Sequence, residues 1–404
     1  MIDVALLAAL LSAAAEAERS EKSTPAQILD FSDPRPLGEW RDWSAEFGGR
    51  GLILEHDSGL ELRLGGRVHY DVARFDDEVL RFADDAGFRR LRGYLTARYD
   101  DWGLRLDNDF GGTVEGWKSV YLRYYGLDSA RVTLGNQVTP FSMEQSTSSN
   151  AIPFLERSIA NALATGLNMG LAVSTRGDNW SAATGFFNDP LDSNAKKRSA
   201  GSGLVGRATW APVLESDGVV HLGASLERRD VDPGSRFRIR ARPESGLANN
   251  RLVNTRSITD VDSTSTYGLE AATRYGPLTV QAEYLRTDVD RESTDVDFDG
   301  WYVQANYMLT GETRRYRRSR GSFAVIDPQS DYGALEVGLR LSALDLNDED
   351  IDGGEEQNVT LGLNWYWSRN VRFMANYVRA EAEPNQDGAD DQVDILQFRA
   401  QVTL

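Results

Sequence analysis

Apolar and polar residues alternate strictly through most of the chain from Leu60 onward. The end of the chain, residues 396–404, shows the pattern clearly as Leu-Gln-Phe-Arg-Ala-Gln-Val-Thr-Leu. Residues two positions apart point to the same side of a strand, so each such segment has an apolar face and a polar face. Repeated without helical interruption, this pattern predicts an all-β fold, a single transmembrane β-barrel with an apolar exterior and a wet interior.

The alternating segments predict about 16 antiparallel strands joined in sequence order. Connections on one side of the barrel are tight, whereas those on the other are longer and polar, such as 230–263 and 344–357. Outer-membrane barrels have this asymmetry. The segment 311–330 is an exception, because it is a long connection on the short-turn side. We place the strands near residues 60–74, 88–100, 102–111, 117–126, 130–137, 167–176, 178–188, 202–211, 218–229, 264–275, 277–287, 298–310, 331–343, 358–368, 370–381 and 393–404.

The N-terminus predicts export. Residues 4–11 are a short apolar stretch, and a small-x-small cleavage pattern follows that ends at Ala17. We therefore predict a signal peptide over residues 1–17, with an N-terminal helix of a soluble protein as the alternative. Residues 18–46 are predicted to be a periplasmic lead-in, and residues 47–404 the outer-membrane barrel.

Tryptophans on the predicted apolar faces indicate that the barrel is surrounded by a membrane. Aromatic girdles form at membrane interfaces because the ring is apolar and its N–H stays wet. We therefore expect contact with lipid in the bacterial outer membrane, with a soluble β-sandwich as the alternative. The net charge of −18 argues against a nucleic-acid partner, and a chain without cysteine has no disulfides. The tryptophans are Trp102, Trp180, Trp210, Trp301, Trp365 and Trp367.

The connection 138–166 contains apolar residues that a water-exposed loop would not need. We predict that this third long loop folds into the barrel and constricts it. An ordinary external loop packed on its neighbours is the alternative. Its one basic residue, Arg157, is offset by Glu144 and Glu156. The apolar residues are Phe141, Ile152, Phe154, Leu155, Ile159 and Leu163.

Short stretches spread along the chain carry a family resemblance. They are Gly65-Gly66-Arg67, Phe88-Arg89-Arg90-Leu91-Arg92, Pro140-Phe141-Ser142, Thr147-Ser148-Ser149, Phe154-Leu155-Glu156-Arg157-Ser158, Leu309-Thr310-Gly311-Glu312, Arg315-Tyr316, Tyr332-Gly333-Ala334-Leu335-Glu336, Asn364-Trp365-Tyr366 and Asn376-Tyr377-Val378. Through them the chain resembles the phosphate-selective porins O and P over nearly all residues after 47. The resemblance implies a homotrimeric outer-membrane porin whose basic residues draw in small anions, phosphate especially. These roles carry over to Arg67, Arg89, Arg90 and Arg157.

Sorting strand residues by face gives an independent argument. With the apolar face toward lipid, thirteen basic residues point into the lumen against eight acidic ones. Basic rings in a pore attract anions, and the guanidinium fork suits phosphate. The basic set is Arg63, Arg67, Arg90, Arg92, Arg98, Arg105, Arg123, Arg131, Arg207, Arg274, Arg340, Arg372 and Arg399. The acidic set is Glu61, Asp71, Asp107, Asp109, Glu227, Glu270, Glu283 and Glu336.

From both arguments we predict a passive channel for small anions, phosphate first. One alternative is a general or organic-anion porin without phosphate selectivity, because the third loop has only one basic residue. Another is a lumen whose mixed charges merely hold water and brace one another. The predicted anion-binding and pore-lining residues are Arg67, Arg89, Arg90, Arg92, Arg105, Arg123, Arg131, Arg157 and Arg372.

The densest basic run lies at residues 314–320, on the predicted periplasmic side. It is either an exit funnel for anions or a solvated turn. We predict no enzyme, metal or cofactor, because the histidines His56, His69 and His221 lack metal-site spacing. A barrel-shaped hydrolase would need His69 or His221 to meet a serine across the lumen. The basic run consists of Arg314, Arg315, Arg317, Arg318 and Arg320.

Overall fold

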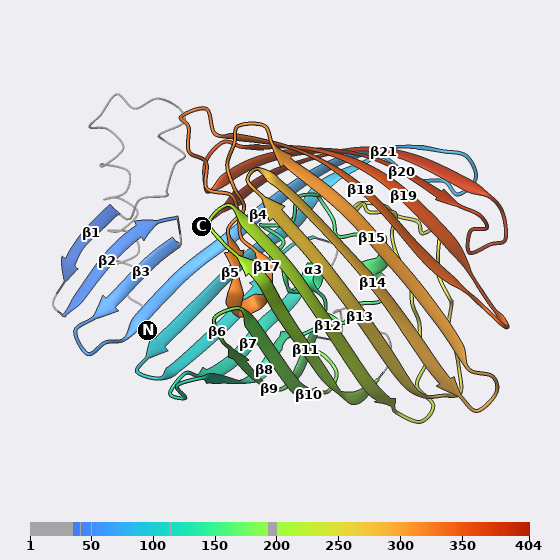
Figure 1. Ribbon diagram of the computed structural model, residues 1–404, viewed down its shortest axis with the longest axis horizontal. Helices are drawn as coiled ribbons and strands as arrows, with labels where there is room; N and C mark the ends of the chain where they lie inside the picture. The colour runs from blue at the N-terminus through green and yellow to red at the C-terminus, as the bar shows by residue number, and fades with distance from the viewer. Residues whose placement is uncertain (1–34, 41, 50, 113–114, 193–199) are drawn as a thin grey trace.

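The computed structural model describes residues 35–404 apart from 41, 50, 113–114 and 193–199. Sixteen antiparallel strands close into one barrel (Figure 1), which confirms the predicted fold. They are β4 (Glu61–Asp77), β5 (Asp85–Tyr99), β6 (Trp102–Asp109), β7 (Gly116–Tyr124), β8 (Ala130–Val138), β9 (Leu167–Arg176), β10 (Trp180–Phe187), β11 (Gly201–Leu214), β12 (Gly218–Val231), β13 (Val261–Tyr275), β14 (Leu278–Arg291), β15 (Val296–Met308), β18 (Ala334–Asp348), β19 (Ile351–Tyr366), β20 (Val371–Ala382) and β21 (Asp391–Thr403). Among these residues, no helix is long and apolar enough to cross a membrane.

The barrel closes where the last strand pairs with the first barrel strand. Strand β21 runs antiparallel to β4 from the pair Thr403–Arg67 to the pair Val393–Asp77. The Gly66 N–H donates to the Leu404 carbonyl at 3.0 Å, and the Leu404 N–H donates back at 2.9 Å. Closure leaves no sheet edge among the barrel strands, and lipid offers no hydrogen bonds to an edge.

Strand β18 shows how the two faces divide. Leu335, Leu339 and Leu341 point outward and are 38%, 44% and 43% exposed, whereas Arg340 and Ser342 point inward and are buried. Exposed apolar residues on the outside suit lipid contact, and polar residues face the lumen. The predicted tryptophans Trp102, Trp180, Trp210, Trp301 and Trp365 are all exposed.

The hairpin between β18 and β19 differs from the prediction. The sequence predicts a long loop over 344–357, but β18 continues to Asp348 and β19 begins at Ile351. Here outward-facing polar residues are cross-strand partners, as in the pair Asp345–Glu355. Above the lipid belt both faces of a strand are wet, so the strand continues without apolar alternation.

Three further strands precede the barrel. They are β1 (Arg35–Trp40), β2 (Trp43–Gly48) and β3 (Gly51–His56), and they extend the sheet from β4 at the end of the barrel where the C-terminus lies (Figure 1). The predicted periplasmic lead-in, residues 18–46, thus contains β1 and most of β2. The predicted signal peptide, residues 1–17, lies outside the described residues.

Two long connections enter the barrel from its long-loop end. The third loop, residues 138–166, contains the short helix α3 (Met143–Ser146) and the 3-10 turn η1 (Ile159–Ala162). The fifth loop, residues 232–260, joins β12 to β13. Their apolar residues share one buried cluster with the inner wall, which holds both loops inside.

A third connection enters from the short-turn end. This periplasmic segment, residues 309–333, joins β15 to β18 and contains β16 (Tyr316–Arg317), η2 (Arg318–Arg320) and β17 (Ser322–Phe323). Phe323 packs with Met143 of the third loop in a small buried cluster. Figure 1 shows β17 and α3 within the ring of strands.

The exposed leucines test the lipid-facing assignment. We expect Leu339→Arg to lower the free energy of unfolding by about 2–4 kcal/mol, because it places a charge in the apolar belt. Gln357→Arg, on the outward face of β19 in the polar region, should cost less than about 1 kcal/mol. Reversible urea unfolding in lipid vesicles measures both. Equal costs at the two positions would contradict the assignment.

Candidate functional site: the lumen constriction

The third loop crosses the lumen and is tied to the far wall. The Arg67 Nη1 of β4 donates to Ser149 Oγ at 2.9 Å. On β20 the Arg372 Nη1 donates to the Ile152 carbonyl at 2.9 Å, and on β21 the Arg399 Nη1 donates to the Leu155 carbonyl at 2.5 Å. The loop therefore lies inside the barrel, as predicted from its apolar residues.

Strand β14 holds the loop at helix α3. The carboxylate of Glu283 accepts the backbone N–H of Met143 at 3.0 Å and of Glu144 at 2.6 Å. The Tyr302 hydroxyl donates to the same carboxylate at 2.6 Å. Free N–H groups at the start of a helix bind carboxylates well, so one acidic side chain fixes the orientation of this turn.

The fifth loop carries a stripe of arginines that the sequence analysis missed. Residues 236–242 read Arg-Phe-Arg-Ile-Arg-Ala-Arg; Phe237, Ile239 and Ala241 are buried, and the arginines are exposed or half-buried. This alternation is the signal that could have identified it, but we took the segment for an ordinary polar loop. We call Arg236, Arg238, Arg240, Arg242 and Arg251 the fifth-loop arginines.

Buried polar contacts of Glu244 attach this loop to the wall. Its carboxylate accepts the hydroxyls of Ser342 and Thr360, each at 2.6 Å, and the N–H of Ile159 at 3.0 Å. Arg340 completes the set with an ion pair. Glu244 thus joins the fifth loop, the third loop and strands β18 and β19.

The fifth-loop arginines raise the local positive potential. Burial, followed by repulsion from Arg240, Arg242 and Arg238, lowers the pKa of Arg251 to about 10. Burial also lowers the pKa of Arg242, followed by repulsion from Arg89 of β5. Cations held this close together favour the arrival of an anion.

Strands β4 to β8 carry the predicted wall arginines, and all of them point inward. Arg92 pairs with Asp109 at 2.7 Å and Arg105 with Asp107 at 3.0 Å. Two others, Arg123 and Arg131, have neutral partners. Arg123 donates to Thr133 Oγ1 at 2.9 Å and Arg131 lies 5.7 Å from the Tyr125 ring.

At the constriction, Arg89 and Arg90 lie beside Glu156 of the third loop. Arg89 donates through Nε and Nη2 to the two Glu156 oxygens at 2.7 and 2.8 Å. Burial raises the pKa of Glu156, but Arg89, Arg90 and Arg399 lower it more, so the net pKa lies well below its ordinary value. Arg90 is buried and lies 3.4 Å from His69 Nδ1.

Two predicted anion contacts instead support the loop. Arg157 donates to the carbonyls of Glu144 at 2.9 Å, Gln145 at 3.4 Å and Thr147 at 2.8 Å. Arg372 donates to the third-loop carbonyls of Ile152 and Pro153. These guanidinium groups are occupied by backbone oxygens, which no sequence pattern predicts because the acceptors depend on the path of the loop.

The periplasmic segment, predicted as an exit funnel or a solvated turn, contacts the third loop, and its arginines differ in exposure. Arg314 is buried, pairs with Glu336 at 2.6 Å and donates to the Ala151 carbonyl at 2.9 Å. Burial lowers the pKa of Arg320, and Arg123 and Arg105 of the wall lower it further. Arg315, Arg317 and Arg318 complete the predicted basic run; Arg318 donates to the Asp178 carbonyl at 3.2 Å.

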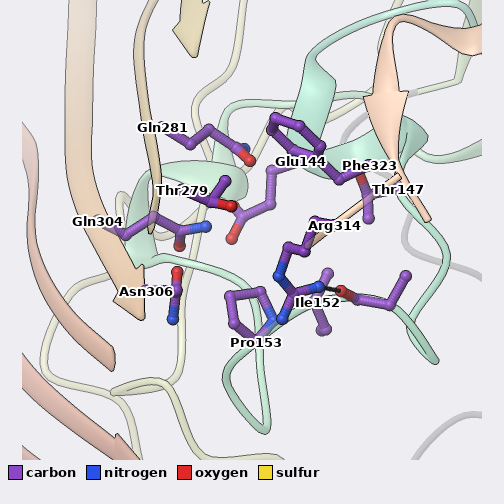
Figure 2. A pocket seen from close by; sticks show the side chains of 11 residues that line it. Glu144, Thr147, Ile152, Pro153, Thr279, Gln281, Gln304, Asn306, Arg314 and Phe323 are labelled. Atoms are coloured by element: carbon purple, nitrogen blue, oxygen red, sulfur yellow. Dashed lines mark hydrogen bonds between the residues drawn. The ribbon is translucent and has the colours of Figure 1, made fainter. Parts of the chain in front are cut away.

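A small cavity with about 20 Å³ accessible to water, lined in part by polar side chains, lies between the third loop and the periplasmic segment. Figure 2 shows Glu144 pointing from the third loop toward Gln304, with Arg314 beside Pro153. Gln304 and Asn306 are almost fully buried. Such a polar lining suits ordered water.

The two lumen histidines also serve the inward segments. His69 lies 3.1 Å from Asn150 Oδ1 of the third loop, and His221 lies 2.6 Å from the Tyr316 hydroxyl and 3.0 Å from Glu270. Neither of these hydrogen-bond sets includes the serine that a hydrolase would need. No metal-binding group of three or more acidic or histidine side chains occurs among the described residues.

Comparison with known proteins places this barrel in a family. The model of the phosphate-selective porins O and P matches residues 62–404. The chain belongs to this porin family. It is therefore an outer-membrane channel protein. Porin O of Pseudomonas aeruginosa is 28% identical to it over 402 residues, which cover 85% of this chain and 90% of that protein.

Solved structures agree on the fold. A loop-deletion mutant of OmpT, an outer-membrane protein of Vibrio cholerae, matches with a TM-score of 0.57 at 13% identity. The match covers 85% of this chain and 99% of that one. An anion-selective porin from Comamonas acidovorans matches with a TM-score of 0.54 at 14% identity, over 85% of this chain and 100% of that one.

The hydrogen bonds of Arg157 predict that the shape of its guanidinium group matters more for the stability of the third loop than its charge does. Arg157→Lys keeps the charge, but its donors all lie on one nitrogen, so it cannot reproduce the spread of bonds from Nε and Nη2 to the carbonyls. We expect the third loop to be cleaved by an added protease roughly tenfold faster, since a hydrogen bond to a charged group contributes about 1.5–3 kcal/mol. Arg318→Lys, on the exposed side of the periplasmic segment, is the control. An unchanged cleavage rate in Arg157→Lys would show that its charge alone suffices.

The low pKa of Glu156 predicts how acid affects the loop. Its ion pairs stabilise the fold above the unfolded pKa of about 4.3, and this stabilisation is lost as the pH falls through the lower folded value. The difference in melting temperature between the wild type and Glu156→Gln should be constant from pH 7 to about 5 and disappear in stronger acid. Circular dichroism in detergent measures it. Loss of the difference near neutral pH would contradict the assignment.

Proposed function

We propose that this porin is a passive, water-filled channel selective for small anions, with phosphate as its main solute. The observation that carries the proposal is a path of guanidinium groups through the lumen. It starts at the fifth-loop arginines, passes Arg89, Arg90 and Arg67 at the constriction and continues to the wall arginines of β5 to β8. The resemblance to phosphate-selective porins supports the same solute.

The chemistry of the path favours phosphate over a large organic anion. Guanidinium groups donate two parallel hydrogen bonds and remain charged at any physiological pH. Arg98, Arg105 and Arg123 lie 4.7, 4.2 and 4.6 Å from the tyrosine rings of Tyr125, Tyr94 and Tyr121. Stacking on a ring fixes each guanidinium plane while its edge donors stay available.

A general anion channel is the second candidate. It is favoured by the third loop, whose single arginine is bonded to backbone carbonyls.

We also propose that the protein has no catalytic activity and that it contacts outer-membrane lipid through its apolar belt. We further propose that it assembles as a homotrimer and that it is exported by a signal peptide at residues 1–17.

Single-channel recording in a planar bilayer tests the function. In a KCl gradient we expect the sign of the reversal potential to show that chloride permeates more readily than potassium. Added phosphate should block the chloride current by binding along the path. Preference for cations would refute the proposal, and anion preference without phosphate block would favour the general anion channel.

Charge reversal in the fifth loop tests the path. Arg240→Glu and Arg242→Glu should each lower the anion-to-cation permeability ratio severalfold, because they place a carboxylate among the fifth-loop arginines. Arg256→Glu is the matched control on the same loop, since Arg256 is exposed and pairs with Asp387 at 2.8 Å. Equal effects of the three variants would argue against a path along this stripe.

A further inference from the structure

The carboxylate of Glu156 is bound in the way that a passing anion would be. Arg89 donates to both of its oxygens at 2.7 and 2.8 Å, and the Arg399 Nη2 donates to Oε1 at 2.9 Å. A fork on two oxygens with a second guanidinium beside it is the geometry by which arginines bind carboxylate and phosphate. The Glu156 carboxylate thus occupies an anion-binding site at the constriction.

More positive charge surrounds this carboxylate than its direct partners supply. Arg90 and Arg242 interact electrostatically with Glu156. Asp71, bound to Arg399 at 2.6 Å, is the other carboxylate of the group. Four guanidinium groups therefore face two carboxylates, and the cluster keeps a net positive charge with Glu156 in place.

The pair formed by Arg89 and Glu156 borders the open lumen. Their side chains are 17% and 15% exposed, whereas that of Arg399 is fully buried. Gly246 of the fifth loop packs directly against them, since a Cβ at this position would lie 2.3 Å from Arg89 Nε and 3.1 Å from Glu156 Oε1. The fifth loop and the third loop thus meet at this pair.

We propose that Glu156 is a tethered counter-anion that sets how tightly the constriction binds a passing anion. It occupies the donors of Arg89 that phosphate would otherwise bind, and it lowers the charge of the cluster by one. A channel needs binding strong enough for entry and weak enough for release. The inference rests on the proposed anion channel. Glu156 is the residue that keeps anion binding at the constriction weak.

Replacing this carboxylate by its amide gives the decisive measurement. In Glu156→Gln the amide oxygen can still accept, but the amide nitrogen cannot, so at least one Arg89 donor becomes available and the cluster gains one positive charge. We expect the phosphate concentration that blocks half of the chloride current to fall about tenfold, and the conductance to saturate at lower KCl. Glu61→Gln is the control, because Glu61 is a lumen carboxylate paired with Arg63 at 2.9 Å, away from the constriction. It should change the half-blocking concentration less than about twofold.

A purely structural role would give a different result. If Glu156 only held the loop in place, Glu156→Gln would raise the conductance at every salt concentration and leave the half-blocking phosphate concentration unchanged or higher. That outcome would overturn the inference. It is also distinct from failure of the proposed function, which would appear as cation preference of the wild type in the same recordings.

A second pair of variants covers the case in which Glu156→Gln does not fold. Arg89→Gln leaves the carboxylate without its fork, so the half-blocking phosphate concentration should rise about tenfold. Arg89→Gln combined with Glu156→Gln restores the net charge of the cluster and should return the value to within about threefold of the wild type. A double variant that behaves like Arg89→Gln alone would overturn the inference.

Discussion

Pairing of β21 with β4 is the constraint on which the rest of this structure depends. Lipid cannot hydrogen-bond a free strand edge, so the sheet closes on itself, and closure fixes which residues face the lumen. Arg399 and Asp71 become cross-strand neighbours only because their strands meet at this seam. The ion pair they form then supports Leu155 and Glu156 of the third loop.

The segments inside the barrel are held by buried ion pairs. Arg340–Glu244, Arg314–Glu336 and Arg207–Glu270 link the fifth loop and the periplasmic segment to strands β11, β13 and β18. Buried ion pairs contribute little net stability, but breaking one leaves an unpaired charge, so they fix positions well. These three pairs lie on the side of the lumen formed by β11, β13 and β18.

Alternation predicted the strands closely because burial imposes it within the lipid belt. It failed at the β18–β19 hairpin, where both faces are wet, and it could not locate the inward path of the fifth loop. The inward position of the wall arginines of β4 to β8 also followed from the sequence. The ion pairs did not follow from the sequence, because Glu156 and Glu244 lie in loops and reach wall arginines that are far away in the sequence. Arg157 and Arg372 were assigned to the solute for the same reason.

The chain has a net charge of −18, yet we predict a positive lumen, and screening reconciles the two. Many acidic residues lie on the outer surface and have partners there, as Asp288 and Asp297 do with Arg286. Exposed charges farther away than a Debye length, about 8 Å at physiological salt, scarcely act on a solute in the channel. Partly buried charges, such as those of Arg89 and Glu156, are screened much less. A single carboxylate such as Glu156 therefore affects permeation more than the whole acidic exterior.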